Sequence, residues 1–219
     1  MNVDIDEALR YLGAGSGAPD QLRQQACEIA SVLAASVPPR YTYRVFPLVR
    51  EGDQFLLPQA NMVLEGRTAR TMLAQCDQAA LLCCTLGAGF ETMLRSEQAR
   101  DMARAVILDA CGSALVEAGC DAAQKELIHR LPGRCLTDRF SPGYGDLPLD
   151  LQPSICSVLD ARRRLGVHVT DSLLLNPSKS VTAIIGLSDR PQMARVRGCG
   201  YCMMRESCPL RKGGKSCAI

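Results

Sequence analysis

Two adjacent segments near the middle of the chain constrain its fold most. The run from Gln78 to Thr85, QAALLCCT, carries no charge and ends at the glycine-bearing turn Leu86 to Gly89. A short apolar run that stops at a turn predicts a strand buried on both faces. The next residues, Phe90 to Leu131, predict helix throughout, with a break near Ser96. The middle of that helix is rich in Ala, Gly, Ser and Cys. Such small side chains allow close approach by the protein core or by a flat ligand.

The other segments predict a mixture of helices and short strands. Helix is expected over residues 4–12, 19–37, 68–75 and 153–165, and strand over residues 41–49, 55–57, 62–64, 167–175 and 181–187. The strand at 55–57 is expected to pair with the strand at 41–49 across the Gly52–Asp53 turn. Because helices and strands do not alternate regularly, the expected fold class is α+β with a largely antiparallel sheet. We expect one domain over residues 1–189 and a Cys-rich tail over residues 190–219.

Length and composition fit a single domain with an appendage. The chain has 219 residues, of which 47% are hydrophobic and 22% charged, so it can bury a sizeable core. Its longest uncharged apolar run, Ala79 to Phe90, has 12 residues, whereas a membrane-spanning helix needs about 20. The N-terminal sequence MNVDIDEALR is acidic, unlike a secretory signal. We therefore expect a cytoplasmic protein without a membrane partner.

The charge of the chain is uneven. The formal net charge is +2, but residues 190–219 contain five Arg, two Lys and one Glu and carry +6, which leaves −4 on the body. No basic stripe runs through the body, so nucleic acid is not an expected partner. The tail arginines are either solvated, or they screen an anionic centre or dock an acidic partner.

The twelve cysteines of the chain form two groups. The eight in the body follow no regular spacing and are expected to be buried thiols, because nothing indicates the oxidising compartment that disulfides need. The other four form the pattern C-x2-C-x5-C-x8-C: Cys199, Cys202, Cys208 and Cys217. Four thiolates suit either a structural zinc or an iron–sulfur cluster. The Cys208–Pro209 step is typical of ferredoxin-type loops and favours [4Fe-4S]; zinc, or a tail of idle thiols, is the alternative.

Three further segments of the body occur in a distinctive order. The loop RFSPGYGD, Arg139 to Asp146, contains R-x-x-x-G-Y, Thr170 to Ser172 lies in a predicted strand, and the turn Pro177 to Val181 has the form Pro-x-x-Ser-Val. Together with the small-residue helix at 105–125, these segments resemble the reactivation domain of cobalamin-dependent methionine synthase over roughly residues 20–190. The resemblance implies a C-shaped α+β domain whose central, twisted antiparallel sheet is flanked by helices. It also implies binding of S-adenosylmethionine.

In that family the domain remethylates cob(II)alamin, for which an electron reduces the cofactor and S-adenosylmethionine supplies the methyl group. The resemblance implies that Arg139 pairs with the carboxylate of the ligand, and a guanidinium fork suits that group. It implies that the backbone at Ser141 and Gly143 faces the ligand and that Tyr144 lines the adenosine or corrinoid side. The alternative is that Arg139 forms a structural ion pair and that Tyr144 packs.

The sequence departs from the family pattern in three ways. The aromatic pair that the family places near the ligand falls at Ile185–Gly186. The acidic contact of the first long helix has no clear match, and Glu28 is the nearest candidate. No methyltransferase barrel or cobalamin-binding domain is found, so the chain is expected to act on cobalamin held by a partner.

The expected function is that of an S-adenosylmethionine-binding reactivator in methionine biosynthesis, a methyltransferase-associated component. Its expected partners are a cobalamin-dependent methyltransferase or corrinoid protein and a low-potential electron donor. One alternative is an iron–sulfur protein that reduces corrinoids without binding S-adenosylmethionine, and another is a zinc-stabilised binding module. The histidines, His129 and His168, are expected to lie on the surface or to pack, and Glu117 is expected on a solvated helix face.

Overall fold

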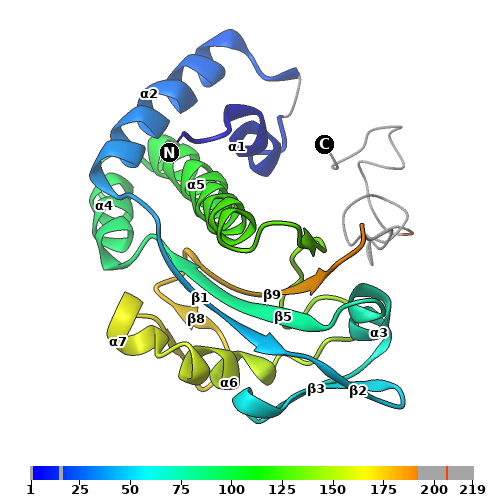
Figure 1. Cartoon of the computed structure of the whole chain (residues 1–219). Helices are drawn as coiled ribbons and strands as arrows, with labels where there is room; N and C mark the ends of the chain where they lie inside the picture. The colour runs from blue at the N-terminus through cyan, green and yellow to red at the C-terminus, as the bar shows by residue number, and fades with distance from the viewer. Residues whose placement is uncertain (1, 15–16, 192–205, 207–219) are drawn as a thin grey trace.

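The computed structural model describes residues 2–14, 17–191 and 206, as Figure 1 shows. The helices are α1 (Ile5–Tyr11), α2 (Asp20–Ser36), the 3₁₀ helix η2 (Pro58–Ala60), α3 (Arg67–Leu73), α4 (Ala88–Gln98), α5 (Met102–Arg130), α6 (Leu151–Val158) and α7 (Ala161–Leu165). The strands are β1 (Arg40–Pro47), β2 (Val49–Glu51), β3 (Gln54–Leu57), β4 (Met62–Leu64), β5 (Gln78–Thr85), β6 (Cys135–Leu136), β7 (His168–Val169), β8 (Leu175–Asn176) and β9 (Ser180–Ser188).

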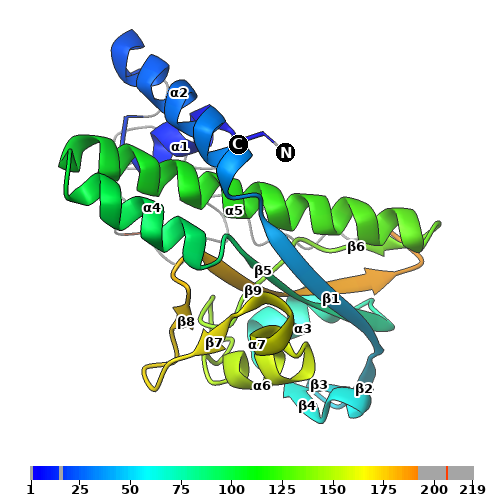
Figure 2. The same cartoon turned by 90° about the vertical axis from the view of Figure 1, so that its left-hand side faces the viewer.

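A four-stranded antiparallel sheet in the order β1-β5-β9-β6 forms the centre of the fold. Its strand β5 covers the predicted residues, and every side chain from Ala79 to Thr85 is buried. Helices α1, α2, α4 and α5 cover one face of the sheet and are called the α5 layer below. Helices α3, α6 and α7 and the small sheets lie on the other face and form the α6 layer, as Figures 1 and 2 show. The predicted α+β class with an antiparallel sheet is confirmed.

The long helical region consists of two helices. The break lies at residues 99–101 and not near Ser96. Asp101 restarts the helix, because its carboxylate accepts hydrogen bonds from the amides of Ala103 at 2.9 Å and Arg104 at 3.2 Å. These two amides have no carbonyl partner inside α5, so a carboxylate cap stabilises its first turn.

Small residues on α5 allow that helix to lie against its neighbours. A Cβ atom at Gly112 would lie 2.5 Å from the Phe90 ring of α4. A Cβ atom at Gly119 would lie 2.7 Å from the Cys84 sulfur of β5 and 2.6 Å from Pro39. Because real side chains do not approach so closely, any larger residue would push α5 away from the sheet. Close packing of the core therefore accounts for the small side chains at these two positions.

Three predicted elements differ from the structure. Residues 55–57 pair with the separate strand β2, whereas β1 pairs with β5. The predicted strand at 167–175 is divided into β7 and β8, because the chain reverses over residues 170–174. The predicted helix at 153–165 is divided into α6 and α7 at Asp160, whose φ of 51° is left-handed and cannot continue a helix.

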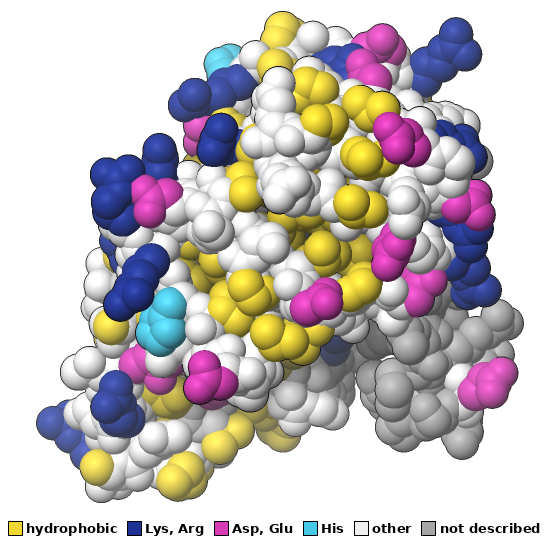
Figure 3. All heavy atoms as spheres, turned by 90° about the horizontal axis from the view of Figure 1, so that it is seen from below, with side chains coloured by type: hydrophobic (Ala, Val, Ile, Leu, Met, Phe, Trp, Pro, Cys, Tyr) yellow, Lys and Arg dark blue, Asp and Glu magenta, His cyan; other side chains and the backbone are white. Residues whose placement is uncertain are grey.

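The surface of the α6 layer is partly apolar. Figure 3 views the molecule from this side and shows hydrophobic side chains over the middle of the face, with Lys and Arg mainly along its margins. The exposed large hydrophobic residues on the elements of this layer are Val49, Val63, Leu149 and Leu174. Within the described ranges, no helix is long and apolar enough to cross a membrane.

Candidate ligand-binding site

Arg139 lies at the edge of the central sheet, shortly after β6. The backbone there runs beside β9, since the Thr137 amide donates to the Gly186 carbonyl at 3.0 Å and Phe140 and Ile184 exchange hydrogen bonds of 3.1 and 2.8 Å. Consecutive side chains of an extended chain point to opposite faces. The buried Phe140 accordingly packs in the core of the α6 layer, and Arg139 faces α5. The main chain therefore sets the direction of the guanidinium.

Three polar side chains of α5 hold the Arg139 guanidinium. Its Nη1 donates to Asp121 Oδ1 and Gln124 Oε1, each at 2.5 Å, and its Nη2 donates to Glu117 Oε2. The three partners are spaced four and three residues apart, which places them on one helix face. Only 7% of the Arg139 side chain is exposed, against 35% for Glu117 and 53% for Asp121. The expectation that Glu117 serves a solvated face alone is wrong, because Glu117 forms an ion pair with this buried arginine.

The charges around Arg139 keep it cationic. Burial by itself lowers the pKa of Arg139, but the nearby carboxylates of Glu117 and Asp121 outweigh burial and hold the pKa above its ordinary value. Tyr11 on α1 is also influenced by the charge of Glu117. Burial, a hydrogen bond with Glu7 and the charges of Glu7 and Glu117 raise the pKa of Tyr11 to about 12. The site thus combines one permanent cation with acidic side chains.

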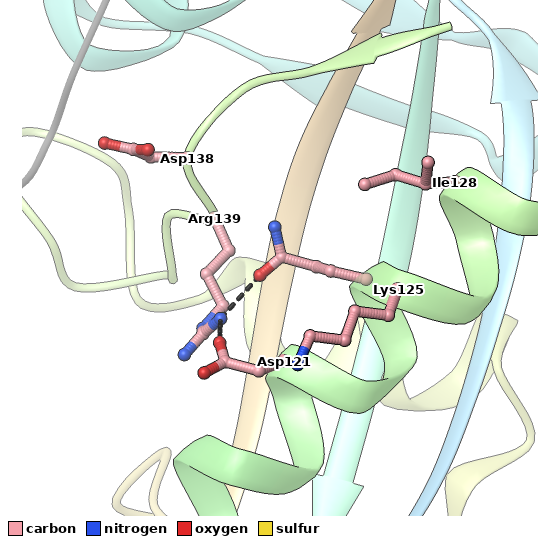
Figure 4. A pocket seen from close by; sticks show the side chains of 6 residues that line it. Asp121, Lys125, Ile128, Asp138 and Arg139 are labelled. Atoms are coloured by element: carbon pink, nitrogen blue, oxygen red, sulfur yellow. Dashed lines mark hydrogen bonds and ion pairs between the residues drawn. The ribbon is translucent and has the colours of Figure 1, made fainter. Parts of the chain in front are cut away.

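A hollow of about 260 Å³ opens beside this ion-pair cluster. It is lined by Asp121, Gln124, Lys125, Ile128, Asp138 and Arg139. Figure 4 shows Arg139 extended toward α5, with Asp138 directed away from it. The side chain of Lys125 is exposed and has no ion-pair partner in the described part of the chain. The hollow is therefore lined by the buried guanidinium of Arg139, which already has hydrogen-bond partners, by the exposed Lys125, and by the carboxylates of Asp121 and Asp138.

The loop after Arg139 forms hydrogen bonds within itself. The Gly143 amide donates to the Leu147 carbonyl at 2.9 Å, and the Tyr144 amide donates to the Ser141 carbonyl at 3.0 Å. Gly143 has a φ of 82°, a value that favours glycine. A Cβ atom there would also lie 3.1 Å from Leu149 Cδ1. These bonds define the loop shape, and the ligand contacts of Ser141, Gly143 and Tyr144 stay predictions.

Asp146, at the end of the loop, fastens it to α3. Its carboxylate accepts hydrogen bonds from the amides of Arg67 at 2.5 Å and Thr68 at 2.8 Å. Bonds from the Thr68 side chain and from these two amides lower the pKa of Asp146 to about 2. Glycines make the approach possible, since a Cβ atom at Gly66 would lie 2.9 Å from the carboxylate, and one at Gly145 would lie 2.3 Å from Thr68 Oγ1. The R-x-x-x-G-Y motif does not predict this contact, because Asp146 and the amides of Arg67 and Thr68 lie far apart in the chain.

Replacing Asp146 by alanine is expected to lower the free energy of unfolding by about 1 kcal/mol at neutral pH, the usual cost of losing a helix cap. Because the folded state lowers the pKa of Asp146 from 3.8 to about 2, this contribution is complete above pH 3.8 and is lost as the pH falls toward 2. Urea unfolding at several pH values measures both effects. The Asp146→Asn variant keeps an acceptor without the charge, so it should retain most of the stability and lose this pH dependence. Equal stability of wild type and Asp146→Ala at pH 7 would contradict the capping role.

The body cysteines match the prediction of buried thiols in most cases. Cys83, Cys84, Cys111, Cys120 and Cys156 are buried, Cys76 and Cys135 are half-buried, and Cys27 is exposed. In the part of the chain that the structure describes, no group of three or more His, Cys, Asp or Glu side chains could hold a metal ion. The predicted metal ligands Cys199, Cys202, Cys208 and Cys217 lie outside the described residues.

The remaining candidates lie away from the hollow. Glu28 is exposed on α2 and accepts a hydrogen bond from Gln24 at 3.1 Å, and it does not line the hollow beside Arg139. Ile185 is buried in the core, while Gly186 belongs to the closely packed sheet, because a Cβ atom there would lie 2.5 Å from Cys76 Sγ. His129 and His168 are exposed. The acids that meet Arg139 come instead from α5.

Comparison with known proteins identifies the fold. The sequence matches no protein-family model and no curated protein. The chain is similar to a solved structure, the crystal structure of the MetH reactivation domain bound to AdoHcy, at 16% sequence identity and a TM-score of 0.67. The match covers 97% of this chain and 82% of that chain. This chain therefore has the fold of the MetH reactivation domain.

Proposed function

We propose that this chain binds S-adenosylmethionine and supports the reductive methylation of cob(II)alamin held by a partner corrinoid protein or methionine synthase. The shared fold supports the proposal, because the related MetH domain was crystallised with AdoHcy. The observation that carries it is the position of Arg139 in the R-x-x-x-G-Y loop, buried against two carboxylates beside a surface hollow. This arrangement suits a ligand that carries both signs of charge.

The amino-acid end of S-adenosylmethionine has an α-carboxylate, an α-ammonium and, further along, a sulfonium. Its carboxylate would replace Asp121 and Gln124 at Nη1 of Arg139 and would accept charge-assisted hydrogen bonds there. The ammonium would then pair with the carboxylate that Asp121 releases. Because the Arg139–Asp121 ion pair would be replaced by ion pairs of Arg139 and Asp121 with the ligand, no charge is left buried and unpaired. The exposed Lys125 adds positive charge at the rim.

The chain's own residues would bind and orient this methyl donor, and the partner would present the cobalt. Arg139, Glu117 and Asp121 would fix the amino-acid end, while the loop through Ser141, Gly143 and Tyr144 would lie along the rest of the ligand. The cob(II)alamin of the partner accepts one electron from a low-potential donor and the methyl group of S-adenosylmethionine. S-adenosylhomocysteine is the other product, so electrons and atoms balance.

Arg139→Ala is expected to weaken S-adenosylmethionine binding by about 1.5–3 kcal/mol, or roughly ten- to a hundredfold, as for other charge-assisted hydrogen bonds. Isothermal titration calorimetry with S-adenosylmethionine and S-adenosylhomocysteine measures the change. Arg134→Ala is a matched control, because Arg134 is also largely buried and also pairs with two carboxylates, those of Asp77 and Asp189. That control should bind the ligand like wild type. Equal affinities for wild type and Arg139→Ala would overturn the assignment of Arg139.

The spacing of the tail cysteines favours one further proposal, an iron–sulfur cluster or a zinc ion bound by Cys199, Cys202, Cys208 and Cys217. A cluster there would supply the low-potential electron. If the chain were only an electron-transfer protein, it would reduce corrinoids without affinity for S-adenosylmethionine. Calorimetry on the wild-type chain thus separates this alternative from the reactivator, and metal analysis separates both from a zinc-stabilised binding module.

A further inference from the structure

Two neighbouring cysteines of β5 each face a cysteine of the layer that covers their side of the sheet. Cys83 belongs to the core of the α6 layer together with Cys156 of α6. Cys84 belongs to the core of the α5 layer together with Cys120 of α5. The alternation of side chains along a strand produces this arrangement. The side-chain hydrogen bonds between Cys83 and Cys156 and between Cys84 and Cys120 make these thiols two pairs, and the central strand contributes one thiol to each.

The two pairs differ in access to solvent. Cys156 is 8% exposed and lines a hollow of about 330 Å³ together with Arg162 and His168. Cys84 and Cys120 are each 0% exposed, and Gly119 closes tightly over the Cys84 sulfur. A small reagent can therefore reach Cys156 from the surface, whereas it can reach the Cys84–Cys120 pair only after the core opens.

We propose that Cys156 and Cys83 form an oxidation site, in which a hydroperoxide reacts at Cys156 and Cys83 closes a disulfide. In the first step the Cys156 sulfur attacks the hydroperoxide, the O–O bond breaks, and a sulfenic acid and an alcohol or water form. In the second step the Cys83 sulfur attacks the sulfenic sulfur, the S–S bond forms, and water leaves with the proton of Cys83. The two thiols are oxidised by two electrons and the hydroperoxide is reduced by two.

The contact between the two thiols supports this order of events. A hydrogen bond between the Cys83 and Cys156 side chains lowers the pKa of Cys156, although burial acts in the opposite direction. The same bond and burial raise the pKa of Cys83. In the other pair, the hydrogen bond with Cys84 and burial raise the pKa of Cys120. Cys156 is therefore the thiol that a reagent meets first, because solvent reaches it through the hollow whereas Cys83 is 0% exposed.

Peptide mapping of the full-length protein tests the proposal with an internal control. The reduced chain is treated with hydrogen peroxide, blocked with iodoacetamide at successive times and digested with trypsin. The peptide of residues 140–162 contains a single cysteine, Cys156, whereas residues 71–95 contain Cys83 and residues 105–125 contain Cys120. The expected product joins 140–162 to 71–95, and fragmentation assigns the link to Cys83. It should form at least about tenfold faster than a link between 71–95 and 105–125, which requires local opening.

Variants sharpen the result. Cys83→Ser keeps a hydrogen-bonding group beside Cys156 but cannot form the link, so it should leave a sulfenic acid at Cys156 that dimedone traps. Cys120→Ala is the matched control and should leave the Cys83–Cys156 link unchanged. If Cys83→Ser does not fold, the wild-type rates alone decide. Equal rates for the two links would show oxidation through unfolding and would overturn the proposal. So would an unreacted Cys156 in the folded protein, or Cys156 converted to sulfinic acid without any link.

Discussion

A mixture of this chain, a cob(II)alamin-loaded corrinoid protein, a low-potential reductant and S-adenosylmethionine is expected to develop the absorption spectrum of methylcobalamin. The same mixture without the chain is expected to stay as cob(II)alamin. The physical reason is that the methyl donor must be held over the exposed upper face of the corrinoid, and the site beside Arg139 is proposed to hold it. Release of S-adenosylhomocysteine, measured by chromatography, should match the methylcobalamin formed.

Two controls make this assay decisive. The chain has no Asp-x-His-x-x-Gly segment, and His129 and His168 are its two histidines, so it should not retain cobalamin by axial coordination when the corrinoid protein is left out. At S-adenosylmethionine concentrations below saturation, Arg139→Ala should slow methylation, and Arg134→Ala should not. Spectral change at the same speed with and without the chain would exclude a reactivator. If the corrinoid is reduced but no S-adenosylhomocysteine is formed, the result would instead favour the electron-transfer alternative.

Replacing Cys202 by serine is expected to abolish metal binding altogether. A four-thiolate centre that loses one ligand from its closest pair, Cys199 and Cys202, loses most of the free energy of binding. The body should stay folded, because the described residues 2–14 and 17–191 form two hydrophobic cores of their own. Iron, zinc and sulfide analysis after anaerobic purification measures the first expectation, and circular dichroism measures the second. Cys27→Ser, which changes an exposed cysteine of the body, is the matched control and should keep the metal.

The metal content also decides what the tail does. Iron and sulfide in equal amounts, about four of each per chain, would fit a [4Fe-4S] cluster and an electron-donor role. Stoichiometric zinc without iron would leave a structural role and remove the electron donor from the proposed function. A chain without any metal after strictly anaerobic preparation would refute the tail site.

The central part of the fold could be predicted residue by residue, and the parts around it could not. Strand β5 was identified over its full length because a strand buried on both faces needs an uncharged apolar run. The pairing of residues 55–57 was wrong because Pro47 ends β1 and a new strand begins at Val49. A short strand has too few residues for its pattern to reveal its partner. The predicted helix over residues 153–165 is divided by the left-handed backbone conformation of Asp160. The hydrophobic periodicity of the sequence does not indicate such a conformation.

The candidate site, like the fold, could be predicted only in part from the sequence. The R-x-x-x-G-Y motif led to the prediction of Arg139 as a ligand contact, which stays a prediction, and its ion-pair and hydrogen-bond partners Glu117, Asp121 and Gln124 were missed. They come from a helix whose rotation about its axis is set by packing of its small residues on the sheet, not by local sequence. Their spacing of four and three residues was the available signal, because it marks a polar strip on a helix that is otherwise largely buried. Asp146 was likewise beyond prediction, since the amides it caps lie on α3.

The hydrogen bonds that place Arg139 beside β9 join backbone atoms to backbone atoms. Every residue type except proline supplies the same amide and carbonyl, so most substitutions along this edge leave the ladder intact. Such a frame tolerates extensive divergence in sequence, because the backbone keeps its course while side chains are exchanged. A chain with 16% identity to the MetH domain can in this way keep the same fold. Searches for distant relatives should therefore weigh the order and register of the strands above the overall similarity of the sequences.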